Sequence, residues 1–360
     1  MRIAVITLVS GRHAHLALQQ RGLAAGTRRP DHYVVVAVDD PAVPGVLRGR
    51  PPSADVVPVQ REDGRLPLAA ARNTGARRAL TSGADVLVFL DVDCVPGPTL
   101  VARYAEAAED GALLGGTVAY LDPPPAGGYR LAELAASAPP HPGRPVPADG
   151  EVLRGGDHRL FWSLSFALTA PTWERIGGFC ERYTGYGGED TDFARGAAAR
   201  GVGLWWVGGA PAYHQHHPVS HPPVEHLDDI LRNGAVYRSR WGHWPMGGWL
   251  RDFARLGLAE HDPVTDTWRR TEAGRSAQRQ AGNPVAMDKN DVHKTETHEP
   301  GRSADDSAAD EAVRELAALH REDDTGDPPE EEKGIGDPLR PGRHANQEAL
   351  TESPSDPSSD

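Results

Sequence analysis

Short apolar runs alternate with longer stretches of helical composition along residues 1–119. The apolar runs lie at residues 3–8, 33–38, 56–59, 86–90 and 113–119, and the helical stretches lie at 13–25, 68–81 and 98–108. The runs are continuously apolar, which is typical of strands that helices cover on both faces. This alternation predicts an α/β fold with a mostly parallel central sheet flanked by helices. Ligands of such sheets bind beyond the carboxyl ends of the strands.

Changes in composition divide the rest of the chain. Residues 120–150 contain eight prolines and no periodicity, which predicts a long surface loop or lid. Strands are then expected at 161–168 and 203–207, helices at 189–199 and 224–240, and a tryptophan-rich helical cap at 241–258. The predicted divisions are residues 1–119, the loop at 120–150, residues 151–270 and a tail at 271–360.

Charge separates the tail from the body of the protein. The chain has a net charge of -13, and residues 271–360 hold 22 acidic and 10 basic residues, so the body is nearly neutral. The tail is also rich in proline and serine and poor in large apolar residues, which predicts disorder. The neutral body argues against nucleic acid as a partner, because such binding needs a basic surface.

The number of cysteines and the N-terminal residues indicate the cellular compartment of the protein. Cys94 and Cys180 are too few for a disulfide framework or a thiolate zinc site, which fits a reducing environment. The apolar run at residues 3–9 is too short for a signal peptide, and no run reaches the roughly 20 apolar residues of a membrane-spanning helix. These features predict a cytoplasmic protein. A peripheral position at the inner face of the membrane, through residues 241–249, is the alternative.

Two carboxylates follow the apolar run at 86–90. Asp91 and Asp93 end a buried strand, where desolvation and mutual repulsion are costly unless a cation compensates them. Mg²⁺ and Mn²⁺ take oxygen ligands and bridge to phosphates, so the pair predicts a metal-bound phosphorylated ligand. The alternative is a solvated pair that begins a turn before Pro96.

Other polar residues lie near the strand ends. Asp39 and Asp40 end the run at 33–38 and are expected to line the same crevice, unless they act only as turn or cap residues. Arg72 and Asn73 lie among small residues of a predicted helix that packs close to the sheet. This position leaves Arg72 able to reach a diphosphate as a fork donor.

The second half combines acids, glycines and aromatic rings. Residues 177–193 are rich in glycine and aromatic residues, and Glu189, Asp190 and Asp192 lie at the predicted start of a helix. Capping alone explains the acids but not the glycines and rings. Carbohydrate sites combine rings with carboxylates, and a carboxylate can deprotonate an attacking hydroxyl. A histidine cluster at 213–218 follows the next predicted strand and offers an imidazole to the metal shell.

Together these segments resemble a GT-A nucleotide-sugar glycosyltransferase of the family 2 type. The resemblance rests on residues 38–40, 71–75, 89–93 and 177–192, and it covers about residues 1–215. The last segment is also similar to the acceptor module of galactosyltransferases, with Tyr186 where that module often has tryptophan.

The resemblance implies a GT-A fold and a role for each matched residue. The implied donor contacts are Asp39, which meets the nucleotide base, together with Asp40, Arg72, Asn73 and Asp91. The implied ligands of a Mn²⁺ or Mg²⁺ ion are Asp93, Asp91 and His214, with His216 as a rival to His214. The implied acceptor residues are the catalytic base Asp190, its neighbour Glu189, which holds the acceptor hydroxyl, and Tyr186, Gly187 and Gly188.

The implied reaction is that of a metal-dependent, inverting hexosyltransferase. A sugar moves from a nucleotide-diphosphate sugar to the hydroxyl of a carbohydrate or other acceptor, a lipid-linked acceptor included. One alternative is a sugar nucleotidyltransferase, which needs a glycine-rich basic signature after the first strand; Gly11 and Arg12 form a poor version of it. The other alternative is a non-catalytic carbohydrate-binding protein of the same fold.

Overall fold

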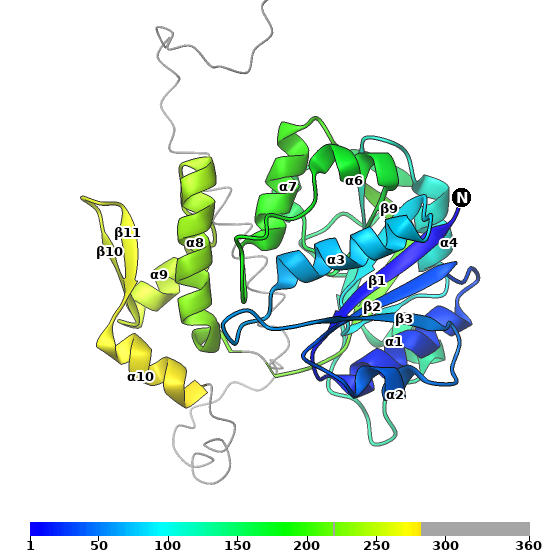
Figure 1. The fold of residues 1–360 in the computed structure, drawn as a ribbon, viewed down its shortest axis with the longest axis horizontal. Helices are drawn as coiled ribbons and strands as arrows, with labels where there is room; N and C mark the ends of the chain where they lie inside the picture. The colour runs from blue at the N-terminus through cyan, green and yellow to red at the C-terminus, as the bar shows by residue number, and fades with distance from the viewer. Residues whose placement is uncertain (219, 282–360) are drawn as a thin grey trace, which may run out of the picture. The chain divides into compact units, whose positions relative to one another are not determined.

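The structure is a computed structural model that describes residues 1–218 and 220–281. A large twisted sheet lies in the first of these ranges (Figure 1). Within these residues the sheet contains nine strands: β1 (Ile3–Val9), β2 (His32–Val38), β3 (Ala54–Val59), β4 (Val86–Leu90), β5 (Cys94–Pro96), β6 (Ala112–Tyr120), β7 (Val152–Gly156), β8 (Ser165–Thr169) and β9 (Gly203–His214). Their order is β3-β2-β1-β4-β8-β6-β9-β5, and β7 pairs with β9.

Half of this sheet is purely parallel. Strand β1 pairs in parallel with β2 and with β4, and β2 pairs in parallel with β3. Strand β8 runs antiparallel between β4 and β6, whereas β6 and β9 are parallel again. The prediction of an α/β fold with a mostly parallel sheet is therefore confirmed. The carboxyl ends of β1, β2 and β4 meet at one edge, which is where the predicted donor residues begin.

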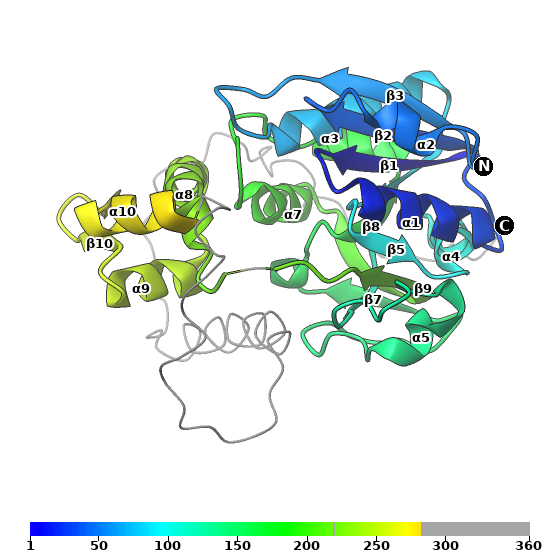
Figure 2. The same cartoon turned by 90° about the horizontal axis from the view of Figure 1, so that it is seen from below.

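Helices cover both faces of the sheet, as the continuously apolar strands predict (Figures 1 and 2). One face packs against α1 (His13–Ala25), α2 (Val43–Leu47) and α4 (Leu100–Ala107), and the other against α3 (Leu68–Thr81), α6 (Ala170–Ile176) and α7 (Glu189–Ala199). Helix α3 lies close to the strands because its buried positions are small. A Cβ atom on Gly75 would lie only 2.5 Å from Cγ2 of Ile6. The outer strand β3 is less covered, and its Val56, Val57 and Val59 are only half-buried.

The segment at 120–150 packs partly onto the sheet. It contains a short 3-10 turn, η1 (Leu131–Glu133), and helix α5 (Leu134–Ser137). Leu121 and Leu134 are buried in one cluster with Val95 and Tyr213. The segment is therefore anchored at these residues, and its action as a lid stays a prediction.

The C-terminal elements form an apolar cluster of their own, beside the sheet in Figures 1 and 2. They are η3 (Val224–His226), α8 (Leu227–Trp241), α9 (Gly247–Arg255), the hairpin β10 (Ala259–Asp262) and β11 (Thr267–Arg270), and α10 (Glu272–Ala281). Helix α9 lies within the predicted tryptophan-rich cap. Helix α10 was expected to be part of the disordered tail, but its Gly274 packs tightly against the backbone of Leu258. The rest of the predicted tail, residues 282–360, lies outside the described residues.

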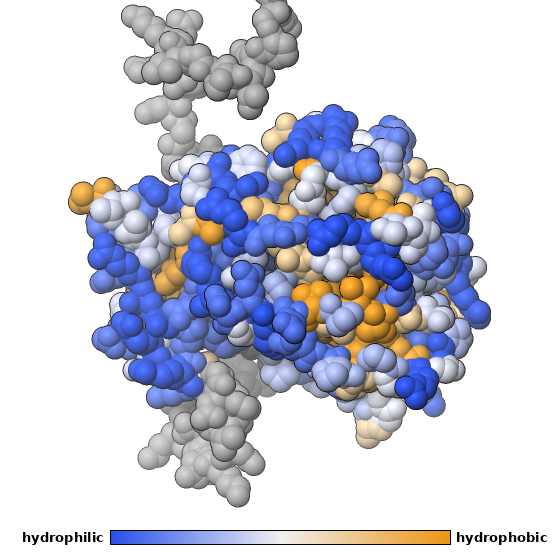
Figure 3. Space-filling model, in the orientation of Figure 1, coloured by the Kyte–Doolittle hydropathy of each residue, from blue (hydrophilic) through white to orange (hydrophobic). Residues whose placement is uncertain are grey.

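Several elements have no clear signal in the sequence. Strand β5 has three residues, and β7 is a partly exposed edge strand that ends in two glycines. The strand predicted at 161–168 starts only at Ser165, as β8, and a turn, η2 (His158–Leu160), lies just before the predicted range. In the described part of the chain, no helix has the length and apolar character needed to cross a membrane. The face in Figure 3 is mostly hydrophilic, with an apolar patch in the region of the edge strand β3.

Candidate active site

Strand pairing brings two distant segments together beyond the end of β4. Asp91 and Asp93 follow β4, and the short strand β5 begins directly after Asp93. Strand β5 pairs antiparallel with the end of β9, and Cys94 lies opposite His214. The backbone N–H of Gln215 also donates to the carbonyl oxygen of Asp93 at 2.7 Å. This ladder holds Asp93 beside the histidine segment that follows β9.

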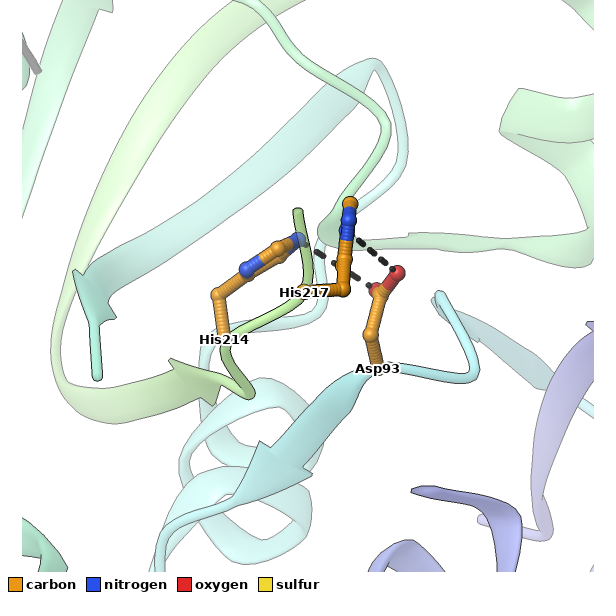
Figure 4. Close-up of side chains that lie close together, drawn as sticks. All are labelled: Asp93, His214 and His217. Carbon is orange, nitrogen blue, oxygen red and sulfur yellow. Dashed lines mark ion pairs between the residues drawn. The ribbon is translucent and has the colours of Figure 1, made fainter. Parts of the chain in front are cut away.

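Asp93, His214 and His217, which we name the Asp93 cluster, point toward one another (Figure 4). One ligand atom from each residue lies within 4.8 Å of the other two. His214 Nε2 is 3.6 Å from Asp93 Oδ1, and His217 Nε2 is 3.5 Å from Asp93 Oδ2. One carboxylate and two imidazoles at these distances form a group that can hold a divalent cation.

The Asp93 carboxylate itself fits such an ion. Its Oδ1 atom is buried and has no hydrogen-bond partner among the described residues. An unpaired buried carboxylate oxygen is costly, and a cation would remove that cost. Because this oxygen faces His214, the Asp93 cluster offers a mixed oxygen and nitrogen donor set.

The protonation states also suit a metal. Burial opposes the charge on Asp93, but His214, His217 and Arg12 hold the pKa of this carboxyl well below its usual range. Burial lowers the pKa of His214 to about 4, against the attraction of Asp93. At neutral pH Asp93 is therefore ionised and His214 is neutral, and these are the forms that bind metal ions.

The histidine that joins His214 differs from the one named in the sequence analysis. His216 is the rival ligand that the resemblance implies. Strand β9 ends at His214, however, and the chain turns there. The turn brings His217 to Asp93, whereas the backbone N–H of His216 donates to the hydroxyl oxygen of Tyr129 at 3.1 Å. Sequence periodicity gives no signal for a side chain that follows such a turn.

A second group of charges, which we name the acid cluster, consists of Arg72, Asp91, Glu189 and Asp190. Arg72 of α3 is 4% exposed and donates from Nη1 to Glu189 Oε1 at 2.9 Å. From Nη2 it donates to Asp91 Oδ1 at 3.3 Å and to the hydroxyl of Ser163 at 2.9 Å. One buried cation thus joins the end of β4 to the start of α7.

Two carboxyls of the acid cluster have high pKa values. Burial raises the pKa of Asp190 to about 6, and the charge of Glu189 adds to this effect while Arg72 opposes it. Burial likewise raises the pKa of Asp91 to about 6. The positive charge of Arg72 opposes this shift, and the negative charge of Asp93 adds to it. A carboxylate with a pKa near 6 is a stronger base than an ordinary aspartate and is still ionised at neutral pH.

Arg72 and Asn73, which the resemblance assigns to the donor, both bond to protein groups in the structure, and their contact with a donor stays a prediction. Both terminal nitrogens of Arg72 are taken by the acid cluster and Ser163, because a buried guanidinium needs its counter-charges close by. Asn73 exchanges two hydrogen bonds with the backbone of Phe179, at 2.9 and 2.8 Å, and donates to Glu181 at 2.8 Å. These residues therefore connect α3 to the second half of the chain.

Asp39 and Asp40 differ in what surrounds them. Asp40 accepts the backbone N–H of Gly11 at 2.7 Å and contacts the ring of His13 at 2.8 Å, so it holds the turn before α1. Asp39 accepts the backbone N–H of Arg61 at 3.0 Å, and its side chain is 43% exposed. Asp39 is accessible at the strand edge, and its contact with a nucleotide base stays a prediction.

The loop before α7 is held from α8. Asn233 is fully buried and donates to the carbonyl oxygens of Tyr186 at 3.1 Å and of Gly187 at 2.8 Å. Asp229 accepts the backbone N–H of Tyr186 at 3.2 Å. Gly188 ends the loop with φ of 88°, a conformation that favours glycine at the start of α7. The Tyr186 ring is 38% exposed and stacks on His226, with ring centres 4.3 Å apart.

Asp192, the last acid of the 177–193 segment, has a structural role. It is 3% exposed and accepts hydrogen bonds from Tyr183 at 3.2 Å, Arg240 at 2.7 Å and Trp241 at 2.7 Å. These partners tie α7 to the end of α8. Both acids of the Asp-x-Asp sequence at 91–93 belong to one of the two clusters, whereas in the Asp-x-Asp sequence at 190–192 only Asp190 does.

Comparison with known proteins points to one enzyme class. Residues 157–218 match the family model described as the N-terminal domain of galactosyltransferase. The chain is 29% identical over 228 residues to a validoxylamine A glucosyltransferase of Streptomyces hygroscopicus subsp. limoneus, covering 56% of this chain and 48% of that protein. It is 30% identical over 208 residues to a validoxylamine A glucosyltransferase of Streptomyces hygroscopicus subsp. jinggangensis, covering 50% of this chain and 47% of that protein.

Among solved structures, the chain is similar to a mannosyltransferase from Pyrobaculum calidifontis in complex with GDP-Man and Mn²⁺. The TM-score is 0.43 at 17% identity, covering 89% of this chain and 80% of that chain. The chain spans about half the length of the glucosyltransferases that it matches. The resemblance to glycosyltransferases, with a galactosyltransferase-like segment, is confirmed by the family match at 157–218 and by these relatives.

Proposed function

We propose that this protein is a metal-dependent, inverting glycosyltransferase that moves a sugar from a nucleotide-diphosphate sugar to an acceptor hydroxyl. The observation that carries the proposal is that Asp91 belongs to the acid cluster and Asp93 to the Asp93 cluster, although the two residues lie two positions apart after β4. The segment at 157–218, which matches the galactosyltransferase family, contributes Glu189 and Asp190 to the acid cluster and both histidines to the Asp93 cluster. The matched segment thus contributes residues to both clusters at the end of β4.

The Asp93 cluster forms the donor side of the proposed site. Asp93, His214 and His217 would hold the divalent cation, which when bound supplies a Lewis acid for the diphosphate leaving group. Two imidazoles favour Mn²⁺ over Mg²⁺, since Mg²⁺ prefers oxygen ligands alone. Asp39 is exposed at the end of β2, which β1 separates from β4, and we assign it to the nucleotide base.

The acid cluster forms the acceptor side. Asp190 accepts the proton of the acceptor hydroxyl, and its raised pKa suits that task. Glu189 keeps Asp190 in place through its bond to Arg72, rather than holding the acceptor hydroxyl itself. The attacking oxygen then forms its bond to the anomeric carbon as the bond to the diphosphate breaks, and the configuration inverts.

The relatives suggest which substrates to test first. Because two similar proteins are glucosyltransferases of validoxylamine A, we propose a nucleotide-activated glucose as the donor and a hydroxyl of validoxylamine A as the first acceptor to test. A lipid-linked acceptor and a cytoplasmic location stay predictions.

The test is a donor screen that follows the release of nucleoside diphosphate from UDP- and GDP-sugars, with validoxylamine A as acceptor and with Mn²⁺ or EDTA. We expect release with Mn²⁺, its loss in EDTA, and a decrease of at least about 100-fold in Asp93→Ala. Asp55→Ala removes an exposed acid of β3 that pairs with Arg78 and is the matched control. Unchanged release in Asp93→Ala would remove the metal assignment, and synthesis of a sugar nucleotide from NTP and sugar phosphate would favour the nucleotidyltransferase alternative.

A further inference from the structure

The loop after β1 places an arginine at the Asp93 cluster. Gly11 and Arg12 have φ values of 66° and 49°, and α1 begins directly after them. Asp40 fixes this turn by accepting the backbone N–H of Gly11 at 2.7 Å and by contacting the ring of His13. The backbone of Arg12 is thereby held beside the carboxyl ends of the strands, although its side chain has no role in the proposed reaction.

The Arg12 guanidinium forms an ion pair with Asp93. Its Nη1 atom contacts Oδ2, the same oxygen that His217 approaches at 3.5 Å. Within the described residues, Asp93 is the one acid that forms an ion pair with Arg12. The side chain of Arg12 is 39% exposed, whereas that of Asp93 is 11% exposed. The arginine can therefore turn toward solvent, but the aspartate cannot.

We propose that Arg12 and a divalent cation compete for Asp93, so that Arg12 lowers the affinity of the chain for the metal. This inference rests on the metal site of the proposed function. An ion held by Asp93, His214 and His217 would bring two positive charges next to the guanidinium. The single negative charge of Asp93 cannot compensate both cations, and an imidazole adds no negative charge. The Arg12–Asp93 pair must open before the ion binds well.

The competition has a consequence for the order of binding. An anion such as a nucleoside diphosphate beside the ion gives the displaced guanidinium a new partner. The cost of opening the ion pair is then recovered, so metal and diphosphate each strengthen the binding of the other. Arg12 makes the metal site dependent on the presence of the donor.

The experiment compares Mn²⁺ binding by the full chain and its variants, without nucleotide, from the electron paramagnetic resonance signal of free Mn²⁺. Arg12→Gln removes the charge, and we expect it to bind Mn²⁺ about tenfold more tightly than the unmodified chain, as for the loss of an ion pair. Arg12→Lys keeps the charge and should bind Mn²⁺ less tightly than Arg12→Gln. Equal or weaker Mn²⁺ binding by Arg12→Gln overturns the inference.

Two further variants separate this inference from the proposed function. Arg61→Gln is the matched control, because Arg61 lies at the same sheet edge, bonds to Ser10 Oγ at 3.1 Å and approaches Asp39 rather than Asp93. Its Mn²⁺ affinity should not change. Asp93→Asn should lose Mn²⁺ binding. If Asp93→Asn loses Mn²⁺ binding and Arg12→Gln binds Mn²⁺ no more tightly than the unmodified chain, the proposed competition is wrong but the metal site is supported. If Asp93→Asn binds Mn²⁺ normally, the metal site of the proposed function is wrong as well.

A second titration with saturating UDP tests the coupling. UDP should raise the Mn²⁺ affinity of the unmodified chain several-fold more than that of Arg12→Gln, because the variant has no ion pair to open. An equal increase in the two proteins overturns the coupling between metal and diphosphate. Thermal unfolding of each variant confirms that the compared proteins are folded.

Discussion

Asp91 and Asp93 lie two residues apart at the end of one strand, yet their surroundings give the two carboxyls opposite properties. Burial raises the pKa of Asp91 to about 6, although Arg72 lies 3.3 Å away. The pKa of Asp93 is held well below its usual range by His214, His217 and Arg12, although burial opposes this. The first acid shares one buried cation with Glu189, and the second faces several groups that favour its charge.

The difference lies in where each cluster obtains its compensating charge. The acid cluster obtains its compensating charge from within, from Arg72, which is 4% exposed and makes bonds that link α3, the end of β4 and α7. The Asp93 cluster relies on a partly exposed arginine and leaves one carboxylate oxygen without a partner among the described residues. The first arrangement suits a fixed framework that carries a base, and the second suits an exchangeable cation.

The largest expected effect is on the rate, through Asp190→Asn. The amide cannot accept the proton of the acceptor hydroxyl, so kcat should fall by about 10²- to 10⁴-fold. The Mn²⁺ affinity should stay unchanged, since Asp190 is not in the Asp93 cluster. Initial rates at saturating substrates, together with a Mn²⁺ titration, measure both. A loss of Mn²⁺ binding in Asp190→Asn would show that the two clusters are not separate.

The next effect is on stability, through Arg72→Met. This change leaves the buried Glu189 and its neighbours without their cation, so the free energy of unfolding should fall by about 3–5 kcal/mol. Arg77→Met is the matched control on the same helix, because Arg77 is exposed and its pair with Glu181 is 3.4 Å long. The control should change stability by less than about 1 kcal/mol.

Asp93→Asn provides the contrast in the same denaturant experiment. In the absence of metal it removes a charge whose ion-pair partner, Arg12, is already 39% exposed. The low pKa of Asp93 means that the loss of its charge costs stability, but its partners are less buried than Arg72, so the decrease should be smaller than for Arg72→Met. Equal destabilisation by the two variants would mean that the Asp93 cluster is as much a part of the framework as the acid cluster.

The sequence predicts the fold well where the pattern depends on local chemistry. The continuously apolar runs correspond to β1, β2, β4 and β6, and the helices α1, α3 and α7 have the predicted bounds. Burial on both faces of the sheet leaves a strong trace in each of these segments. The small edge elements β5 and β7 leave none, although β5 decides where Asp93 lies.

The site is less predictable because it depends on partners that are distant in the sequence. Asp91 and Asp93 can be singled out from the sequence because they follow a buried strand. The two acidic partners of Arg72, in contrast, lie 19 and 117 residues away from it. Sequence spacing therefore could not show that Arg72 bonds to these two carboxylates. His217 was missed for a similar reason, since its place depends on the turn after His214.

The smallest effect, a pH dependence between 5 and 7, separates the two clusters without a mutation. The raised pKa of Asp190, about 6, means that the base is mostly protonated at pH 5 and mostly ionised at pH 7. Only the ionised form accepts a proton, so kcat should rise about tenfold per pH unit below 6 and level off above it. Over this range Asp93 stays ionised and His214 stays neutral, because the pKa of the first is far below 5 and that of the second is about 4. The rates are measured with Mn²⁺ saturating at each pH, so that metal release does not contribute. A kcat that is constant from pH 5 to 7 would contradict Asp190 as the base, whereas a midpoint near 6 would place the titrating group in the acid cluster.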